Sequence, residues 1–110
     1  MSMWADYKKE REDKQVIEEA DNGFVIYSYP TPEQVWIEDI YVRPDLRQSG
    51  LARKLADQVC EAAKKVGCKQ VLGSVWETAN GATASVKVLL AYGMQLSHIE
   101  GKLIIFKKEL

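Results

Sequence analysis

A polar segment, Arg43–Gly50, joins a strand-like run to a helical pattern and has the composition of an anion-binding loop. The first turn of a helix leaves backbone N–H groups without acceptors, and the helix dipole adds partial positive charge there. Gly50 removes a Cβ where backbone and phosphate approach closely, and Arg47 and Arg53 supply cations nearby. The segment therefore predicts a site for a phosphate-bearing ligand. The alternative interpretation of Gly50 is an ordinary glycine in a tight connection to a helix.

Few other residues could bind a metal, form a disulfide or bind a polyanion such as a nucleic acid. The chain has 2 Cys and 1 His, so neither a disulfide framework nor a Cys/His metal cluster can be assembled, and we expect reduced thiols and no metal. A net charge of -1 gives no electrostatic excess for nucleic-acid phosphates. The apolar runs are far below the roughly 20 residues of a membrane helix, and the start of the chain lacks the pattern of a secretion signal. We expect a cytoplasmic protein with no nucleic-acid or membrane partner.

The elements before this loop are a charged helix and two strands. With 110 residues, the chain has room for one domain. Opposite charges three or four residues apart predict a solvated helix over about Trp4–Glu19, which Asp21–Gly23 ends. The β-branched and aromatic residues of 24–29 and 35–42 predict strands, joined by a Pro-rich turn.

The elements after the loop alternate between helix and strand. Apolar positions at intervals of three and four predict a helix from Leu51 to Val66, closed by Gly67, and residues 70–75 read as a buried strand. This βαβ unit implies parallel strands. A second helix over about 83–92, closed by Gly93, and a hairpin over 94–106, turning at Glu100 and Gly101, complete a mixed α/β (α+β) fold around a central sheet.

Two short motifs carry a family resemblance. The segment RQSGLA, Arg47–Ala52, with the preceding IEDIYVRP, resembles the acetyl-coenzyme A motif of the GNAT N-acetyltransferase superfamily, whose pattern is Arg/Gln-x-x-Gly-x-Gly/Ala. YGM, at Tyr92–Met94, is similar to the family's Gly-Phe at the end of its last helix. The resemblance runs from about Gly23 to the C-terminus. It implies one GNAT-like domain over residues 1–110, with fewer elements before the second strand than is usual.

The resemblance also implies a binding mode for acetyl-coenzyme A. The loop offers backbone donors to the pyrophosphate, the strand before it bonds the pantetheine through its main chain, and two splayed parallel strands admit the cofactor. Asn80, shortly after the next strand, is a further candidate contact, although Asn80 with Gly81 also reads as a simple turn. The implied cofactor-binding residues are Tyr41, Val42, Arg47, Gln48, Ser49, Gly50, Leu51, Ala52, Arg53 and Asn80.

A general base is expected on the strand before the loop. A lysine-like amine at pH 7 must lose a proton at a cost of about 4 to 5 kcal/mol before it can attack. Strand alternation predicts two faces, Trp36, Glu38 and Ile40 on one, and Ile37, Asp39 and Tyr41 on the other. Only one of the two carboxylates then faces the acceptor. We favour Glu38, because the family commonly places a base on this strand; the alternative is that both carboxylates pair with basic residues across the sheet.

The expected general acid departs from the family pattern. Many members carry a Tyr that protonates the coenzyme A thiolate, and its position here is Leu89. Tyr92 and Ser85 lie on nearly the same helical face, so a hydroxyl could act from either, although both are also ordinary helix-packing residues. A thiol pKa near 8.5 also lets the thiolate leave without help.

The sequence therefore predicts an N-acetyltransferase that moves an acetyl group from acetyl-coenzyme A to a primary amine by direct attack. Backbone N–H near Val42 would hold the oxyanion of the tetrahedral intermediate. The acceptor is a small molecule or a protein amine, and a second subunit could complete the cleft as a homodimer. The alternative is a non-catalytic acyl-coenzyme A binding or protein-interaction module on the same fold.

Overall fold

The fold is a six-stranded mixed sheet in the order β1-β2-β3-β4-β6-β5 with helices on both faces. The computed structural model describes residues 2–78 and 82–110, without the side chains of 82–85. Its elements are α1 (Met3–Glu12), β1 (Gln15–Glu19), β2 (Gly23–Thr31), β3 (Gln34–Val42), a 3-10 turn (Pro44–Leu46), α2 (Leu51–Lys65), β4 (Gln70–Trp76), α3 (Ala82–Ala91), β5 (Gln95–Glu100) and β6 (Leu103–Glu109). This arrangement confirms the predicted mixed sheet and its βαβ unit.

The predicted N-terminal helix is wrong in its second half. Asp13 caps α1 in the left-handed conformation at φ 55°, and the chain then enters β1, which pairs antiparallel with β2. The β-branched residues Val16 and Ile17 lie in this strand, and Ile17 packs against the core. Tertiary pairing thus overrides the helical charge spacing of this segment.

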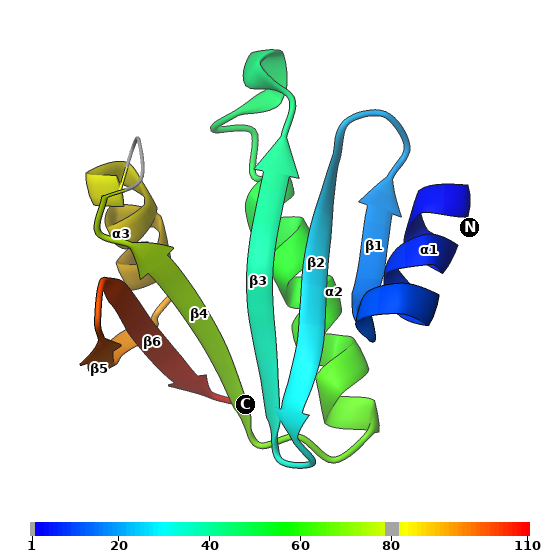
Figure 1. Cartoon of the computed structure of the whole chain (residues 1–110). Coiled ribbons are helices and arrows are strands. Elements are labelled where there is room, and N and C mark those ends of the chain that lie inside the picture. The colour runs from blue at the N-terminus through cyan, green and yellow to red at the C-terminus, as the bar shows by residue number, and fades with distance from the viewer. Residues whose placement is uncertain (1, 79–81) are drawn as a thin grey trace.

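The long helix α2 covers the back of the sheet in the view of Figure 1, over β1, β2 and β3. Its buried residues are Leu55, Ala56, Val59, Cys60 and Ala63. All but Cys60 belong to the predicted stripe, whereas Val66, which the spacing also placed there, is 63% exposed. Three of these residues, Leu55, Val59 and Ala63, have no exposed surface. Burial of this face fixes the direction in which the first turn of α2 projects.

The parallel ladder between β3 and β4 is short. It joins Gln34–Ile37 to Gln70–Gly73 and ends there, although both strands continue. Beyond this point the two strands diverge, as Figure 1 shows toward the loop that follows β3. At the last pair, Gly73 leaves room for Leu89 of α3 and for Met94, which follows α3. An added Cβ at Gly73 would lie 3.1 Å from Met94 Sδ and 3.3 Å from Leu89 Cδ2.

A bulge interrupts β3 at the end of this ladder. Ile37 pairs with Tyr27 and Asp39 pairs with Ile26, so Glu38 is the extra residue. Ile37 and Ile40 consequently lie on the same side, where both line one cavity. The predicted alternation, with Ile40 beside Glu38 and Ile37 beside Asp39, is therefore wrong.

The C-terminal half follows the prediction closely. β5 and β6 form a hairpin that turns at Gly101 and Lys102, and Gly67 and Gly93 take the left-handed conformations expected after α2 and α3. In the part of the chain that the structure describes, no helix is long and apolar enough to span a membrane.

Candidate cofactor cleft and acceptor face

The loop before α2 presents an uncapped helix N-terminus. Gly50 is the N-cap at φ 89°, and no side chain caps the helix there. The first backbone bond of α2 runs from Lys54 N–H to the Gly50 carbonyl, at 3.0 Å. The N–H groups of Leu51, Ala52 and Arg53 therefore have no acceptor within the helix. Together with the helix dipole, they form a site suited to an anion.

Side chains of the loop brace its backbone. Arg47 donates from Nε to the Val42 carbonyl at 3.1 Å, and its guanidinium lies 5.7 Å from the centre of the Tyr41 ring. The Ser49 hydroxyl donates to the Leu46 carbonyl. Gln48 adopts a left-handed conformation at φ 67°. Arg47 and Ser49 thus hold the loop in shape, which leaves backbone groups as its main free donors.

An apolar cavity of about 210 Å³ lies beside the divergence of β3 and β4. It is enclosed by β3, α2 and α3 and by the residues that follow α3. Among the described lining residues, Arg53 alone carries a charge. The lining residues are Ile37, Ile40, Ala52, Arg53, Ala56, Val88, Leu89, Ala91, Tyr92 and Met94. Because Ala52 and Arg53 belong to both this cavity and the first turn of α2, the cavity opens next to the anion site.

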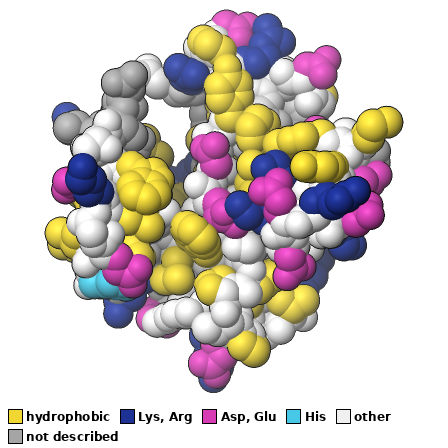
Figure 2. Space-filling view, in the orientation of Figure 1, with side chains coloured by type: hydrophobic (Ala, Val, Ile, Leu, Met, Phe, Trp, Pro, Cys, Tyr) yellow, Lys and Arg dark blue, Asp and Glu magenta, His cyan; other side chains and the backbone are white. Residues whose placement is uncertain are grey.

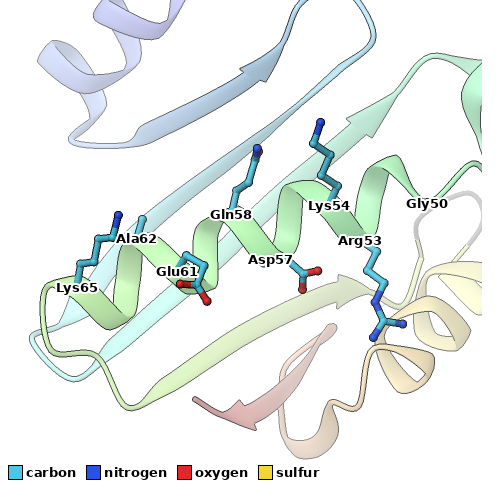
Figure 3. A pocket seen from close by; sticks show the side chains of 8 residues that line it. All are labelled: Gly50, Arg53, Lys54, Asp57, Gln58, Glu61, Ala62 and Lys65. Carbon is cyan, nitrogen blue, oxygen red and sulfur yellow. The ribbon is translucent and has the colours of Figure 1, made fainter.

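A second, shallower depression of about 600 Å³ runs along the outer face of α2 (Figure 3). Its lining is mostly charged or polar, and Figure 3 shows Arg53 and Asp57 pointing to one side of the helix and Lys54 and Gln58 to the other. At the N-terminal end of α2, Gly50 and Arg53 belong both to this depression and to the anion site. The depression is therefore an open, solvated approach to the loop.

Tyr92 connects the end of α3 to α2. Its hydroxyl donates to Asp57 Oδ1 at 2.6 Å and lies 3.5 Å from Cys60 Sγ. Burial, reinforced by the hydrogen bond to Asp57, raises the pKa of Tyr92 far above its usual value. Lys108 lies 4.4 Å from the centre of the Tyr92 ring and donates to the Tyr92 carbonyl at 3.1 Å. The Tyr92 proton is therefore held tightly at neutral pH.

The opposite face of the sheet carries the predicted carboxylates. Glu38 Oε1 pairs with Lys14 Nζ at 2.8 Å, and the Glu38 side chain is only 14% exposed. Asp39 is exposed and makes no ion pair with the residues that the structure describes. Figure 2 shows this face with acidic and basic side chains intermixed among separate hydrophobic patches, not as a field of one sign. Of the two predicted carboxylates, Asp39 is the one that is open to an approaching cation.

Two tryptophans, Trp36 of β3 and Trp76 of β4, belong to this face. The Trp36 indole N–H donates to Ser74 Oγ at 3.0 Å, which joins β3 to the first residue of β4 past the end of their ladder. Trp76, the last residue of β4, is 59% exposed. The face therefore combines a fixed indole with an open one beside the diverging strands.

Most predicted cofactor-binding residues lie together in the loop, at the end of β3 and in the first turn of α2. Asn80 lies outside the described residues, and of Ser85 the structure describes only its place in α3. Sequence reasoning missed Lys14 and Asp57, which gave no signal beyond their charge. It also missed the cavity lining. The signal that could have indicated it is a pair of small residues, Ala52 and Ala56, four positions apart on one face of α2. The missed lining residues are Ile37, Ile40, Ala56, Val88, Ala91 and Met94.

Comparison with known proteins identifies the family. The model of the Acetyltransferase (GNAT) family matches residues 3–94, so the chain belongs to this family. Among curated relatives, a thialysine N-epsilon-acetyltransferase from Bos taurus is 33% identical over 81 residues, which span 72% of this chain and 46% of that protein. The Sus scrofa protein of the same name is 40% identical over 47 residues, 43% of this chain and 28% of that protein. The chain thus spans less than half the length of these relatives.

Solved structures share the fold. An acetyltransferase from Bacillus subtilis in complex with CoA superposes with a TM-score of 0.73 at 16% identity, covering 94% of this chain and 82% of that one. The PaiA N-acetyltransferase from Thermoplasma acidophilum, in complex with coenzyme A, gives a TM-score of 0.72 at 15% identity, covering 81% of this chain and 54% of that one.

Proposed function

We propose that the chain binds acetyl-coenzyme A and transfers its acetyl group to a primary amine by direct attack. The observation that carries this proposal is the continuity of two sites. The apolar cavity beside the diverging strands shares Ala52 and Arg53 with the uncapped first turn of α2. A ligand with an anionic group followed by a slender apolar arm matches both parts at once.

The residues present fit coenzyme A. The N–H groups of Leu51, Ala52 and Arg53 suit the pyrophosphate, with Gly50 and Gln48 shaping the loop and Arg47 bracing it. Tyr41 and Val42 end β3 beside the splay, where main-chain groups no longer pair with β4. When bound, acetyl-coenzyme A supplies a thioester whose carbonyl carbon accepts a nucleophile. Two neighbours of known structure are complexes with coenzyme A.

The bulge at Glu38 is the proposed position of the base. Its two flanking isoleucines, Ile37 and Ile40, line the cavity, while Glu38 and Asp39 face the opposite side of the sheet. Either carboxylate can take the proton that the amine must lose. Glu38 is the less exposed of the two, which favours it as the base. Its ion pair with Lys14 is the alternative stated from the sequence, so Lys14 must leave before a substrate amine can take its place.

The role of Tyr92 follows from its contact with Asp57. A hydroxyl whose proton is held by a carboxylate is a poor acid at neutral pH, so we propose that Tyr92 chiefly orients the end of α3 at the cavity. Before Tyr92 can donate a proton to the leaving thiolate, its hydroxyl must leave Asp57. Ser85 is the other candidate donor. A thiol with a pKa near 8.5 leaves without that help.

The acceptor we propose is a primary amine of lysine-like character. The names of the curated relatives specify acetylation of the N-epsilon group of thialysine, and the exposed Asp39 and partly buried Glu38 suit an ammonium ligand. A protein amine also fits an open face of this kind. We further propose that the protein acts in the cytoplasm and that a second subunit can complete the acceptor side.

Thermal unfolding with ligands tests the cofactor site. A ligand at about 100 times its Kd stabilises the folded state by roughly 2.7 kcal/mol, so coenzyme A and acetyl-coenzyme A should both raise Tm and ATP should not. Gly50→Glu should abolish the shift. Gly67→Glu is the matched control, because Gly67 also has a left-handed φ, 93°, with open space around it, but lies at the far end of α2. No shift with either form of coenzyme A would refute the proposal.

The second candidate is a non-catalytic module that binds acyl-coenzyme A or a protein. Leu89 at the usual acid position and the Tyr92–Asp57 contact favour it. Amine-dependent release of the coenzyme A thiol separates the two. Stabilisation by coenzyme A without thiol release over a panel of lysine-like amines would support the module.

A further inference from the structure

A lysine of the chain itself occupies the proposed base. Lys14 Nζ lies 2.8 Å from Glu38 Oε1, whereas its distance to Glu12 Oε1 is 3.8 Å. Its side chain is 30% exposed, and the hydrogen bond to Glu38 is the largest cause that raises the pKa of Lys14. Lys14 thus places an ammonium group at Glu38, in the position that we propose for the acceptor amine.

The backbone places Lys14 there. Asp13 leaves α1 in the left-handed conformation, and the Lys14 N–H donates to the Lys8 carbonyl at 3.2 Å. Directly afterwards, Gln15 begins β1 and pairs with Tyr27, whose other neighbour is Ile37. Lys14 therefore reaches Glu38 across β2 from a fixed starting point.

The position of Glu38 connects this ion pair to the cleft. Glu38 is the bulged residue between the last β3–β4 pair, at Ile37, and the next cavity residue, Ile40. The backbone of Glu38 thus lies just past the point where β3 and β4 stop pairing, and its carboxylate meets Lys14, which comes from the β1 side. An amine that is hydrogen-bonded to Glu38 has its proton acceptor in place before any reaction begins.

We propose that Lys14 is a self-acetylation site, modified in cis by acetyl-coenzyme A bound in the cleft. The proposal rests on the proposed function. One proton passes from the Lys14 ammonium through Glu38 to water, and the free electron pair of Nζ attacks the thioester carbonyl. The C–N bond forms, the C–S bond breaks, and the coenzyme A sulfur leaves as a thiolate that takes up the second proton. The products are Nε-acetyl-Lys14, coenzyme A and one released proton.

A tethered nucleophile has an advantage over an amine from solution. Lys14 is held at Glu38 by the fold, so no encounter is needed and the effective concentration of the amine is high. The ion pair with Glu38 also distinguishes Lys14 from other lysines that could be acetylated. Lys54 pairs with Glu19 on the α2 side of the sheet. Lys69 is 74% exposed, and it pairs with Glu33 just before β4, at the end of that strand away from the cleft.

The test is site-resolved mass spectrometry of the full chain incubated with acetyl-coenzyme A alone. We expect one acetyl group per chain, at Lys14, at a rate that does not depend on protein concentration. Lys14→Arg, which keeps the ion pair, should leave the chain unlabelled, and Lys69→Arg, the matched control with an ion pair to Glu33 outside the site, should not change labelling of Lys14. Glu38→Gln should slow labelling of Lys14 about 100-fold. Without Glu38, the Lys14 amine loses the contact that keeps it protonated, so a purely chemical reaction would instead accelerate.

Two results would overturn the inference. Labelling in order of exposure, with Lys69 ahead of Lys14, would show chemical acetylation, and an unlabelled Lys14 would show that its amine does not reach the thioester. Thermal unfolding of the same samples with coenzyme A separates this failure from failure of the proposed function. A Tm shift with Lys14 unlabelled would refute self-acetylation alone. The absence of a Tm shift would refute the proposed cofactor site as well.

Discussion

The hydroxyl of Tyr92 offers a direct test of whether the residue orients α3 or transfers a proton. Tyr92→Phe removes the donor to Asp57 Oδ1, at 2.6 Å, and keeps the ring against Lys108. A hydrogen bond to a charged group contributes about 1.5 to 3 kcal/mol, and because Asp57 is exposed it regains water when the donor is lost. We expect a loss of about 1 to 2 kcal/mol in the free energy of unfolding.

Urea unfolding of four proteins measures this contact. The wild type, Tyr92→Phe, Asp57→Asn and the double variant form a cycle, and we expect a coupling of about 1 kcal/mol. In the same preparations, amine-dependent thiol release should change less than about tenfold, below the 10²-fold and larger effects of general acids and bases. Tyr41→Phe is the matched control, since no hydrogen bond to its hydroxyl occurs within residues 2–78 and 82–110; it should cost less than about 0.5 kcal/mol.

The reasoning fails under either of two outcomes. A coupling within about 0.3 kcal/mol of zero would mean that the Tyr92–Asp57 contact contributes nothing to the fold. A 100-fold or larger loss of turnover at unchanged stability, about the size typical of a lost acid, would assign the hydroxyl to catalysis.

Three further predictions concern stability. Leu55→Ala removes a side chain with no exposed surface and should cost about 2 to 5 kcal/mol in urea unfolding, whereas Val66→Ala, at 63% exposure, should cost less than about 0.5 kcal/mol; equal costs would contradict the packing of α2. Gly50→Ala places a Cβ at φ 89° and should lower the free energy of unfolding by about 1 to 2 kcal/mol, and no loss in a thermal scan would mean that the loop adopts another conformation. Burial raises the pKa of the Cys68 thiol and the Tyr27 hydroxyl, so the folded state holds these protons more tightly than the unfolded chain. Stability from these groups is complete below their unfolded pKa values of about 8.5 and 10 and should fall as the pH rises past them; a urea midpoint constant from about pH 8 to pH 10.5 would contradict this.

The sequence was informative wherever one periodicity acted alone. The stripe of α2, the glycines that close α2 and α3, and the hairpin at Gly101 follow local rules, and all were predicted. Residues 15–19 were not, because their charges are spaced as in a helix. Pairing with β2 and burial of Ile17 decide their conformation, and both depend on residues distant in the chain.

The candidate site was predictable in its loop but not on its acceptor face. Gly50 could be predicted as part of an anion site, because a glycine directly before a helical pattern is informative by itself. The bulge at Glu38 has no local signature, since it depends on the register of β3 against β2. The partners of Glu38 and Tyr92, namely Lys14 and Asp57, are set by tertiary contacts that a charge pattern does not encode.

The short β3–β4 ladder also has a mechanical consequence. Four residue pairs, from Gln34–Gln70 to Ile37–Gly73, join β1-β2-β3 with α2 to β4-β6-β5 with α3. Backbone pairing between the two halves is therefore confined to the end farthest from the loop. Toward the loop they are held by side chains, namely the Trp36–Ser74 and Tyr92–Asp57 hydrogen bonds and the shared core. The amides of β3 and β4 beyond Ile37 and Gly73 lack partners across this seam, so a ligand that bonds to them would add the backbone contacts that the ladder does not supply there.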